Sequence, residues 1–344
     1  MNREIRSKAR STSESGYDMP EQNREDASRE PRAVVLLRQA GILVAILVLM
    51  VSFTVSDPRF ISWMNLQNIL RQVSITTVLG VGMTMVILVG RIDLSVGSSV
   101  LLSAVVMNSL IENQVLPVAL AVLAGLLAAS LVGFLNALLI ERAKISTVIV
   151  TLGMMIAIRG VGQIILWINN TWLWVRAPLF RAIKTETFLG IPLPALIMLA
   201  VVLIASVVLR RSPFGRRIYA VGVNDTAARF CGVSPERIRS WVFVLSGLCA
   251  GFGGLLVSAR LSAVSPNVGN GMEFQAITAV ILGGTRFSGG VGSVEKTVLG
   301  AIAIGMILNF MTIKGISAQY QQAATGFIIL LAATIDRATR GRTR

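Results

Sequence analysis

The 344-residue sequence contains no histidine, only two cysteines, and few charged side chains for its length. Without imidazole groups, the chain cannot form a histidine-dependent catalytic triad or proton relay. Cys231 and Cys249 alone cannot make a typical zinc site, and we expect no disulfide between them. Charged residues make up 14% of the chain, against about 25% in soluble proteins. These absences argue against a soluble domain and against histidine-based catalysis.

The sequence has instead long apolar runs, with 54% hydrophobic residues and a mean hydropathy of +0.72. A helix needs roughly 18 or more apolar residues to cross a hydrocarbon core about 30 Å thick. We therefore predict an all-α, polytopic membrane bundle with about ten spans. The eighth span is too short for one regular helix, so we expect it to be tilted, broken or re-entrant, and buried in protein. The predicted spans are 34–56, 67–90, 94–112, 115–140, 146–168, 191–210, 240–259, 273–285, 296–313 and 316–335.

The formal net charge of +15 does not indicate nucleic-acid binding, because the basic residues are clustered beside apolar runs. Residues 1–33 carry balanced charges without apolar periodicity, which predicts a disordered tail. By the positive-inside rule, the basic loop 210–239 and the basic tail 337–344 are cytoplasmic, as are both termini. The membrane domain then spans 34–336. The basic residues concerned are Arg210, Arg211, Arg216, Arg217, Arg229, Arg237, Arg239, Arg337, Arg340, Arg342 and Arg344.

Two glycine-rich segments resemble each other, TMVILVGRIDLSVGS (84–98) and TAVILGGTRFSGGVGS (278–293). They indicate either an internal duplication, which is common in transporters, or two similar breaks that arose by chance. The following stretch GGVGSVEKT (289–297) is not a phosphate-binding loop, because Glu295 stands where the motif needs glycine before Lys296. No paired carboxylates are apparent. We expect no enzymatic activity, no bound cofactor and no metal.

Five polar residues within or beside the apolar runs are candidates for a translocation path. Asp93 and its neighbour Ser95 follow a break at Gly90, where the carboxylate either lines a polar path or caps a solvated helix start. Asn136 and Asn309 favour bonds between helices over a substrate contact. Arg159 lies inside a span and is expected to extend toward the membrane surface. The tentative path residues are Asp93, Ser95, Asn136, Arg159 and Asn309.

The polar segment GVNDTAARFCGVSPERIR (222–239) reads as a short helix between two abrupt turns. Asn224 or Asp225 can cap its start, and Gly232 can end it in a left-handed conformation. Ser234, Pro235 and an acid in the first turn predict a second helix start directly after it. The well-defined caps and Phe230 favour a docking helix, while the alternative is an ordinary solvated loop.

Four segments carry a family likeness: GMTMVILVGRIDLSVGS, STVIVTLGMMIAIRG, FGRRIYAVGVNDTAARFCGV and AITAVILGGTRFSGG. Together they resemble motifs of the permeases of ABC importers for monosaccharides, the ribose, xylose and arabinose group. The likeness covers nearly everything after residue 60. The sequence departs from the family pattern at Arg91, where the family has glycine, at Ser146, where proline is usual, and at Glu295 and Lys296.

The resemblance implies a multi-pass permease of the bacterial inner (plasma) membrane that translocates a sugar and is surrounded by membrane lipid. Its partners would be a cytoplasmic ABC ATPase that binds the ATP, a periplasmic or extracellular sugar-binding protein, and a second permease copy. Alternatives are a permease for another small solute such as a nucleoside, an ion-coupled secondary transporter and, as a distant third, a membrane enzyme. By the resemblance, residues 224–232 form the coupling helix that contacts the ATPase through Asn224, Asp225, Ala227, Ala228, Arg229, Phe230 and Gly232.

Overall fold

The computed structural model describes residues 32–169 and 171–340, and most of the two predicted tails lies outside these ranges. The chain divides into two units, 1–44 and 45–344, and the helix α3 (Arg32–Ser56) crosses the boundary. The second unit contains all the remaining elements. Its helices are η1 (Pro58–Ile61), α4 (Trp63–Leu88), α5 (Val96–Glu112), α6 (Val118–Glu141), α7 (Thr147–Ile168), α8 (Pro178–Thr185), α9 (Leu193–Arg211), α10 (Pro213–Val223), α11 (Asp225–Phe230), α12 (Pro235–Leu261), α13 (Met272–Leu282), α14 (Val294–Ile313) and α15 (Ala318–Arg340).

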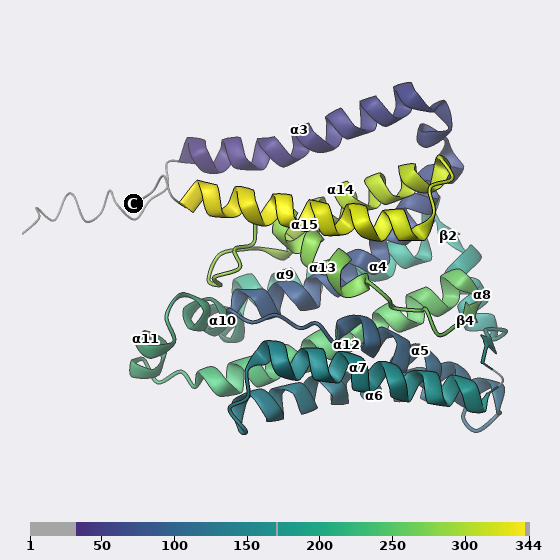
Figure 1. Cartoon of the computed structure of the whole chain (residues 1–344), viewed down its shortest axis with the longest axis horizontal. Coiled ribbons are helices and arrows are strands. Elements are labelled where there is room, and N and C mark those ends of the chain that lie inside the picture. Colours follow the sequence, from purple (N-terminus) through teal and green to yellow (C-terminus); the bar gives the residue numbers. More distant parts are fainter. Residues whose placement is uncertain (1–31, 170, 341–344) are drawn as a thin grey trace, which may run out of the picture. The chain divides into compact units, whose positions relative to one another are not determined.

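Four two-residue strands complete the fold, and all of them lie in loops. β1 (Leu173–Trp174) pairs antiparallel with β4 (Ala263–Val264), and β2 (Thr187–Phe188) pairs antiparallel with β3 (Ile191–Pro192). The first pair fastens the loop after α7 to the end of α12. Figure 1 shows these strands and α8 at one end of the helices of the second unit, and α10 and α11 at the opposite end.

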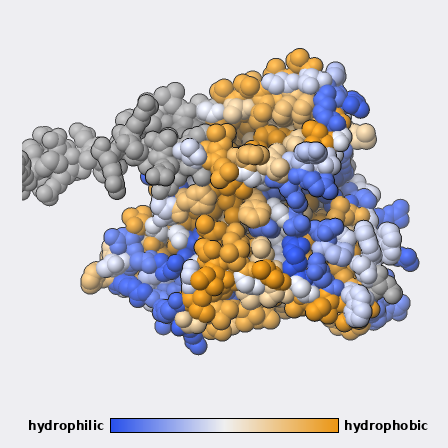
Figure 2. Space-filling view, viewed as in Figure 1, coloured by the Kyte–Doolittle hydropathy of each residue, from blue (hydrophilic) through white to orange (hydrophobic). Residues whose placement is uncertain are grey.

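Each predicted span corresponds to a helix, which confirms an all-α polytopic membrane protein. Among the described residues, α4, α6, α7, α9, α12 and α14 are long and apolar enough to cross a membrane. Helices α5 and α13 are apolar but shorter, as is the part 41–56 of α3. Ten crossings and the cytoplasmic side of both termini stay predictions. On the face drawn in Figure 2, apolar surface occupies the middle of the second unit and hydrophilic residues gather at either end.

Helices α4 and α12 form the centre of the core and are buried along most of their length. Close packing of α12 on α6 depends on glycine. A Cβ atom on Gly133 would come within 2.1 Å of the Phe243 carbonyl oxygen, and one on Gly247 within 2.3 Å of the Ala129 carbonyl oxygen. Small residues let membrane helices approach closely where apolar burial alone gives little driving force.

The two similar glycine-rich segments end their helices in the same way. At the end of α4, the Gly90 amide donates to Ile87 and the next amide to Val86, and at the end of α13 the Gly284 amide donates to Ile281 and the next amide to Val280. Both glycines have positive φ, +70° and +84°. An irregular stretch then leads into α5 or α14. The same pair of bonds, with a glycine of positive φ, also ends α11 and α14, so this geometry does not distinguish a duplication from two similar breaks.

The structure has one more helix, α10, within the segment 210–239 that the sequence analysis assigned to a basic cytoplasmic loop. Its start has the ordinary signals: Pro213 lies in the first turn, and Ser212 Oγ accepts a 3.0 Å bond from the Gly215 amide. Its end packs on the break after α4, since a Cβ on Gly222 would fall 1.8 Å from the Leu88 carbonyl oxygen. The same carbonyl accepts a 2.9 Å bond from the Gly290 amide.

Candidate functional site

Helix α11 has the boundaries that its sequence predicts. Of the two candidate caps, Asn224 caps the helix: its Oδ1 accepts a 3.0 Å bond from the Ala227 amide. Gly232 has a φ of +77° and donates a 2.9 Å bond to Arg229 O, which ends the helix. Pro235 then starts α12, with Ser234 in the N-cap position. The segment is therefore a short, rigidly bounded helix between α10 and α12.

One side of α11 faces the protein and the other projects outward. Ala228 is buried, whereas the Phe230 side chain is 88% exposed. Val223, the last residue of α10, is also largely exposed. A large apolar side chain that extends from a charged surface is a frequent mark of a contact with another protein.

Ion pairs join α11 to the rest of the molecule. The Asp225 carboxylate pairs with the Arg239 guanidinium of α12. The Arg239 side chain is 9% exposed, and its Nη1 lies 4.0 Å from Glu141 Oε2 at the end of α6. On the other side of Glu141, Arg91 Nη2 lies 4.0 Å from Oε1. A line of alternating charges thus runs from α11, through α12 and α6, to the break between α4 and α5.

This line of charges also accommodates the departure from the family pattern at Arg91. The Arg91 side chain is about one-third exposed, and its charge faces the nearly buried carboxylate of Glu141. Breaking a buried ion pair leaves an uncompensated charge in a region of low dielectric. Arg91 and Arg239 both lie near the Glu141 carboxylate, so removal of Glu141 would leave Arg91 without the carboxylate that it faces, whereas Arg239 would still pair with Asp225.

Asp93 lies inside the protein, which excludes the interpretation of a solvated helix end. It is 2% exposed. Its Oδ1 accepts bonds from Ser95 N at 3.0 Å and Ser95 Oγ at 2.6 Å, and its Oδ2 accepts a 3.1 Å bond from Ser246 Oγ of α12. Asn136 Nδ2 of α6 donates a 2.8 Å bond to Ser95 Oγ. Three of the five tentative path residues thus form one network that joins the break to α6 and α12, in which Asn136 Oδ1 is buried without a hydrogen-bond partner.

The other two tentative path residues lie elsewhere. Asn309 and Asn65 exchange two amide bonds of 3.0 Å, which join α14 to α4. Arg159 Nη1 donates to the Val268 carbonyl at 3.5 Å, in the loop before α13, and its extension toward the membrane surface stays a prediction. The structure therefore does not bring the five residues together in one network, and their place along a translocation path stays a prediction.

Comparison with known proteins supplies the family. Residues 65–333 match the family model described as the permease component of the branched-chain amino acid transport system. The chain belongs to this permease family. The match covers every element from α4 into α15, including the break with Asp93 and the segment with α11.

Relatives of the permease are named for sugars. It is 37% identical to the ribose import permease of Haemophilus influenzae over 295 residues, which are 85% of this chain and 91% of the relative. It is 33% identical to the L-arabinose ABC transporter permease of Azospirillum brasilense, over 90% of each chain. It is 34% identical to the D-allose transport permease of Escherichia coli, over 83% of this chain and 86% of the relative. No solved structure matches.

These findings confirm the resemblance that the four motifs indicated. The permease belongs with the ABC sugar permeases, whose named members are transport proteins and not enzymes. The extent of the match, over most of both chains, shows that the resemblance is not confined to the motifs.

The permease has a cavity of about 590 Å³ between α13 and α15. The sequence did not predict this cavity. Its lining includes the side-chain amides of Asn270, Gln275 and Gln322, which were not among the predicted path residues, and the hydroxyl of Thr325. Gln275 and Gln322 lie inside the predicted spans 273–285 and 316–335, so a side-chain amide within a span is the signal that could have found them, whereas Asn270 lies outside every predicted span. The cavity is lined by Asn270, Gly271, Phe274, Gln275, Gln322, Ala323, Thr325, Gly326, Phe327, Ile329 and Leu330.

Proposed function

We propose that the permease is the membrane subunit of an ATP-driven importer that translocates a monosaccharide delivered by an external binding protein. The observation that carries this proposal is α11, a helix bounded at both ends that presents Phe230 outward and is joined by charges to the core. The family supports the importer role, and the relatives named for ribose, arabinose and allose support a sugar as substrate.

The partners follow from this role. A cytoplasmic ATPase binds ATP and receives α11, with the Phe230 ring inserted into a recess of its surface. A second copy of the permease supplies a second α11, because one chain offers a single docking helix. A sugar-binding protein docks on the opposite side, and membrane lipid surrounds the apolar helices. The permease itself holds neither nucleotide nor metal.

Movement of the ATPase reaches the membrane helices by two routes. Displacement of α11 pulls on Asp225, and hence on Arg239 in the first turns of α12. The same displacement shifts Gly222 of α10, which packs on Leu88 and Gly290 at the ends of the two breaks. Both routes end near the start of α5, where the Asp93 network holds α5, α6 and α12 together.

Substitution of the exposed ring tests the docking role. We expect Phe230→Ser to abolish co-purification of the ATPase and ATP-dependent sugar uptake in proteoliposomes, while the permease inserts normally. Phe188→Ser is the matched control, because Phe188 is 65% exposed but lies in β2, at the other end of the helices. Equal loss of ATPase co-purification in both variants, or in neither, would contradict the assignment of α11. Uptake that needs an ion gradient and not ATP would instead indicate a secondary transporter.

A further inference from the structure

The backbone before α13 is irregular, although its neighbours in space are regular helices. Helix α13 has 11 residues, a length of about 16 Å, which is roughly half of a 30 Å hydrocarbon core. Residues 265–271 lead into it from β4 without forming a helix or strand. The carbonyl of Val268 in this stretch accepts the bond from Arg159, which lies near the middle of α7. The short helix therefore begins within the span of its neighbours.

The stretch 265–271 is held firmly in place. A Cβ on Gly269 would come within 2.0 Å of the Gly97 carbonyl oxygen in the first turn of α5. Gly269 and Gly271 both have positive φ, +78° and +77°, so Asn270 sits between two fixed glycines. Irregular backbone at membrane depth is tolerated where it is buried in protein or lines a cavity. Here it lines the cavity between α13 and α15.

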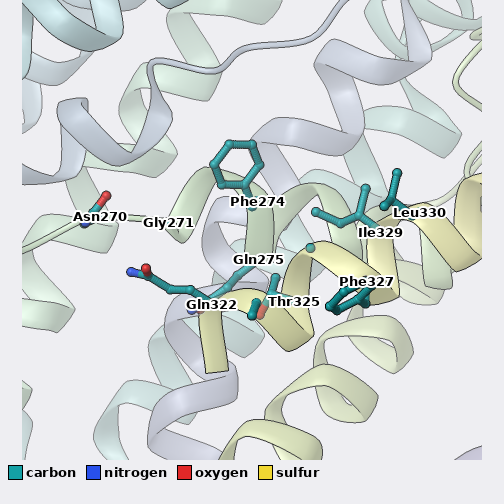
Figure 3. A pocket seen from close by; sticks show the side chains of 11 residues that line it. Asn270, Gly271, Phe274, Gln275, Gln322, Thr325, Phe327, Ile329 and Leu330 are labelled. Atoms are coloured by element: carbon teal, nitrogen blue, oxygen red, sulfur yellow. The ribbon is translucent and has the colours of Figure 1, made fainter. Parts of the chain in front are cut away.

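The cavity has a polar end and an apolar end. Figure 3 shows Asn270, Gln275 and Gln322 toward one side, and Phe327, Ile329 and Leu330 toward the other. In the described part of the chain, no hydrogen bond engages the three side-chain amides. No acidic or basic residue is among the described residues that line the cavity.

These side chains fit an uncharged ligand with several hydroxyl groups. Each primary amide offers two donors and one acceptor oxygen, which matches hydroxyl groups that both donate and accept. The Phe274 ring adds a flat apolar surface. The described lining offers no charged side chain to balance the ammonium or carboxylate group of a free amino acid. The volume of about 590 Å³ is within the usual range of small-molecule sites.

We infer that the cavity between α13 and α15 is a site for the sugar during translocation, with Asn270, Gln275 and Gln322 as its hydrogen-bonding residues. The inference rests on the proposed import function and names the site within it. The entry loop of the half-length helix α13 lies beside the start of α5 at Gly269 and beside the middle of α7 at Val268. Asn270 follows in this loop, Gln275 lies in α13, and Gln322 comes from the start of α15. When the sugar leaves the binding protein, the amides form the hydrogen bonds with its hydroxyl groups that water would otherwise form.

Protection of an introduced cysteine tests the site. In a Cys231→Ser background, which removes the exposed native thiol, Gln322→Cys is treated with a membrane-impermeant methanethiosulfonate. The other native cysteine, Cys249, is buried. The labelling rate is measured on the full permease without ATPase or nucleotide, in the presence of D-ribose, L-arabinose, D-allose or L-leucine at high millimolar concentration. We expect at least one sugar to slow labelling several-fold, and L-leucine to have no effect.

Tyr320→Cys is the matched control, because Tyr320 is exposed on the same helix but does not line the cavity. Its labelling should not change with sugar, and adding Gln275→Leu to Gln322→Cys should abolish the protection. The inference is overturned if no sugar protects, if Tyr320→Cys is protected equally, if leucine protects, or if Gln322→Cys never reacts because lipid or a second copy covers it. Failure of ATP-driven uptake with intact sugar protection would instead count against the proposed importer function alone.

Discussion

Substitution of Gly232 by valine should uncouple the permease from its ATPase without unfolding the membrane helices. Gly232 ends α11 with a φ of +77°. A β-branched residue reaches this conformation at a cost of about 1–3 kcal/mol. A Cβ atom at this position would meet nothing within 4 Å, so the cost lies in the backbone of the turn and not in a clash with another helix.

A cost of about 1–3 kcal/mol lowers the equilibrium constant for forming the native turn from its alternative conformations by about 5- to 150-fold. When the turn is lost, α11 loses the bonds from the Gly232 amide to Arg229 and from the Val233 amide to Ala228. The outward position of the Phe230 ring then no longer matches its recess on the ATPase. Because the strain is confined to a turn outside the apolar core, membrane abundance should not fall.

The measurement is ATP hydrolysis in proteoliposomes, with and without the sugar-loaded binding protein, together with co-purification of the two subunits. Stimulation should fall at least several-fold in Gly232→Val. Gly232→Asn is the matched control, because asparagine adopts the left-handed conformation more readily than other non-glycine residues and should retain most of the stimulation. Wild-type stimulation and uptake in the valine variant would refute the reasoning, as would equal losses in both variants.

Three further outcomes are expected. A cysteine at Thr226 should react only from the cytoplasmic side and one at Leu189 only from outside; reaction of both from one side would disprove the predicted topology. Asp93→Asn should slow transport while folding persists, since the amide keeps an acceptor for Ser95; wild-type transport would show that the charge is not needed. Arg239→Met should lower the free energy of unfolding by up to about 3 kcal/mol. The double variant with Glu141→Gln should recover part of this loss, and no recovery would show that the two side chains do not interact.

Features encoded by a few neighbouring residues could be predicted from the sequence. A long run of apolar residues identifies each membrane helix. In lipid every backbone N–H and C=O group needs a hydrogen-bond partner, and a single segment can satisfy its own groups only as a helix. The start and end of α11 follow from Asn224 and Gly232, whose effects act within four residues along the chain. The start of α10 is encoded in the same way, by Ser212 as N-cap and Pro213 in the first turn.

Features that depend on which helices lie together could not be read from the sequence. Asp93 was open to two interpretations, because its burial is set by Ser246, a residue of α12 that lies 153 positions away. The pairing of Arg91 with Glu141 likewise depends on where α6 ends relative to the break after α4.

The cavity joins residues 270–275 to residues 322–330, and neither segment shows alone that the other faces it. Charge, hydropathy and capping act over a few residues and survive in the sequence as local patterns. Packing brings distant segments together through shape and close backbone approach, as at Gly97 and Gly269. For that reason the sequence alone determined the membrane class, the family and the boundaries of α11, whereas the buried network and the candidate sugar site were decided only by the tertiary structure.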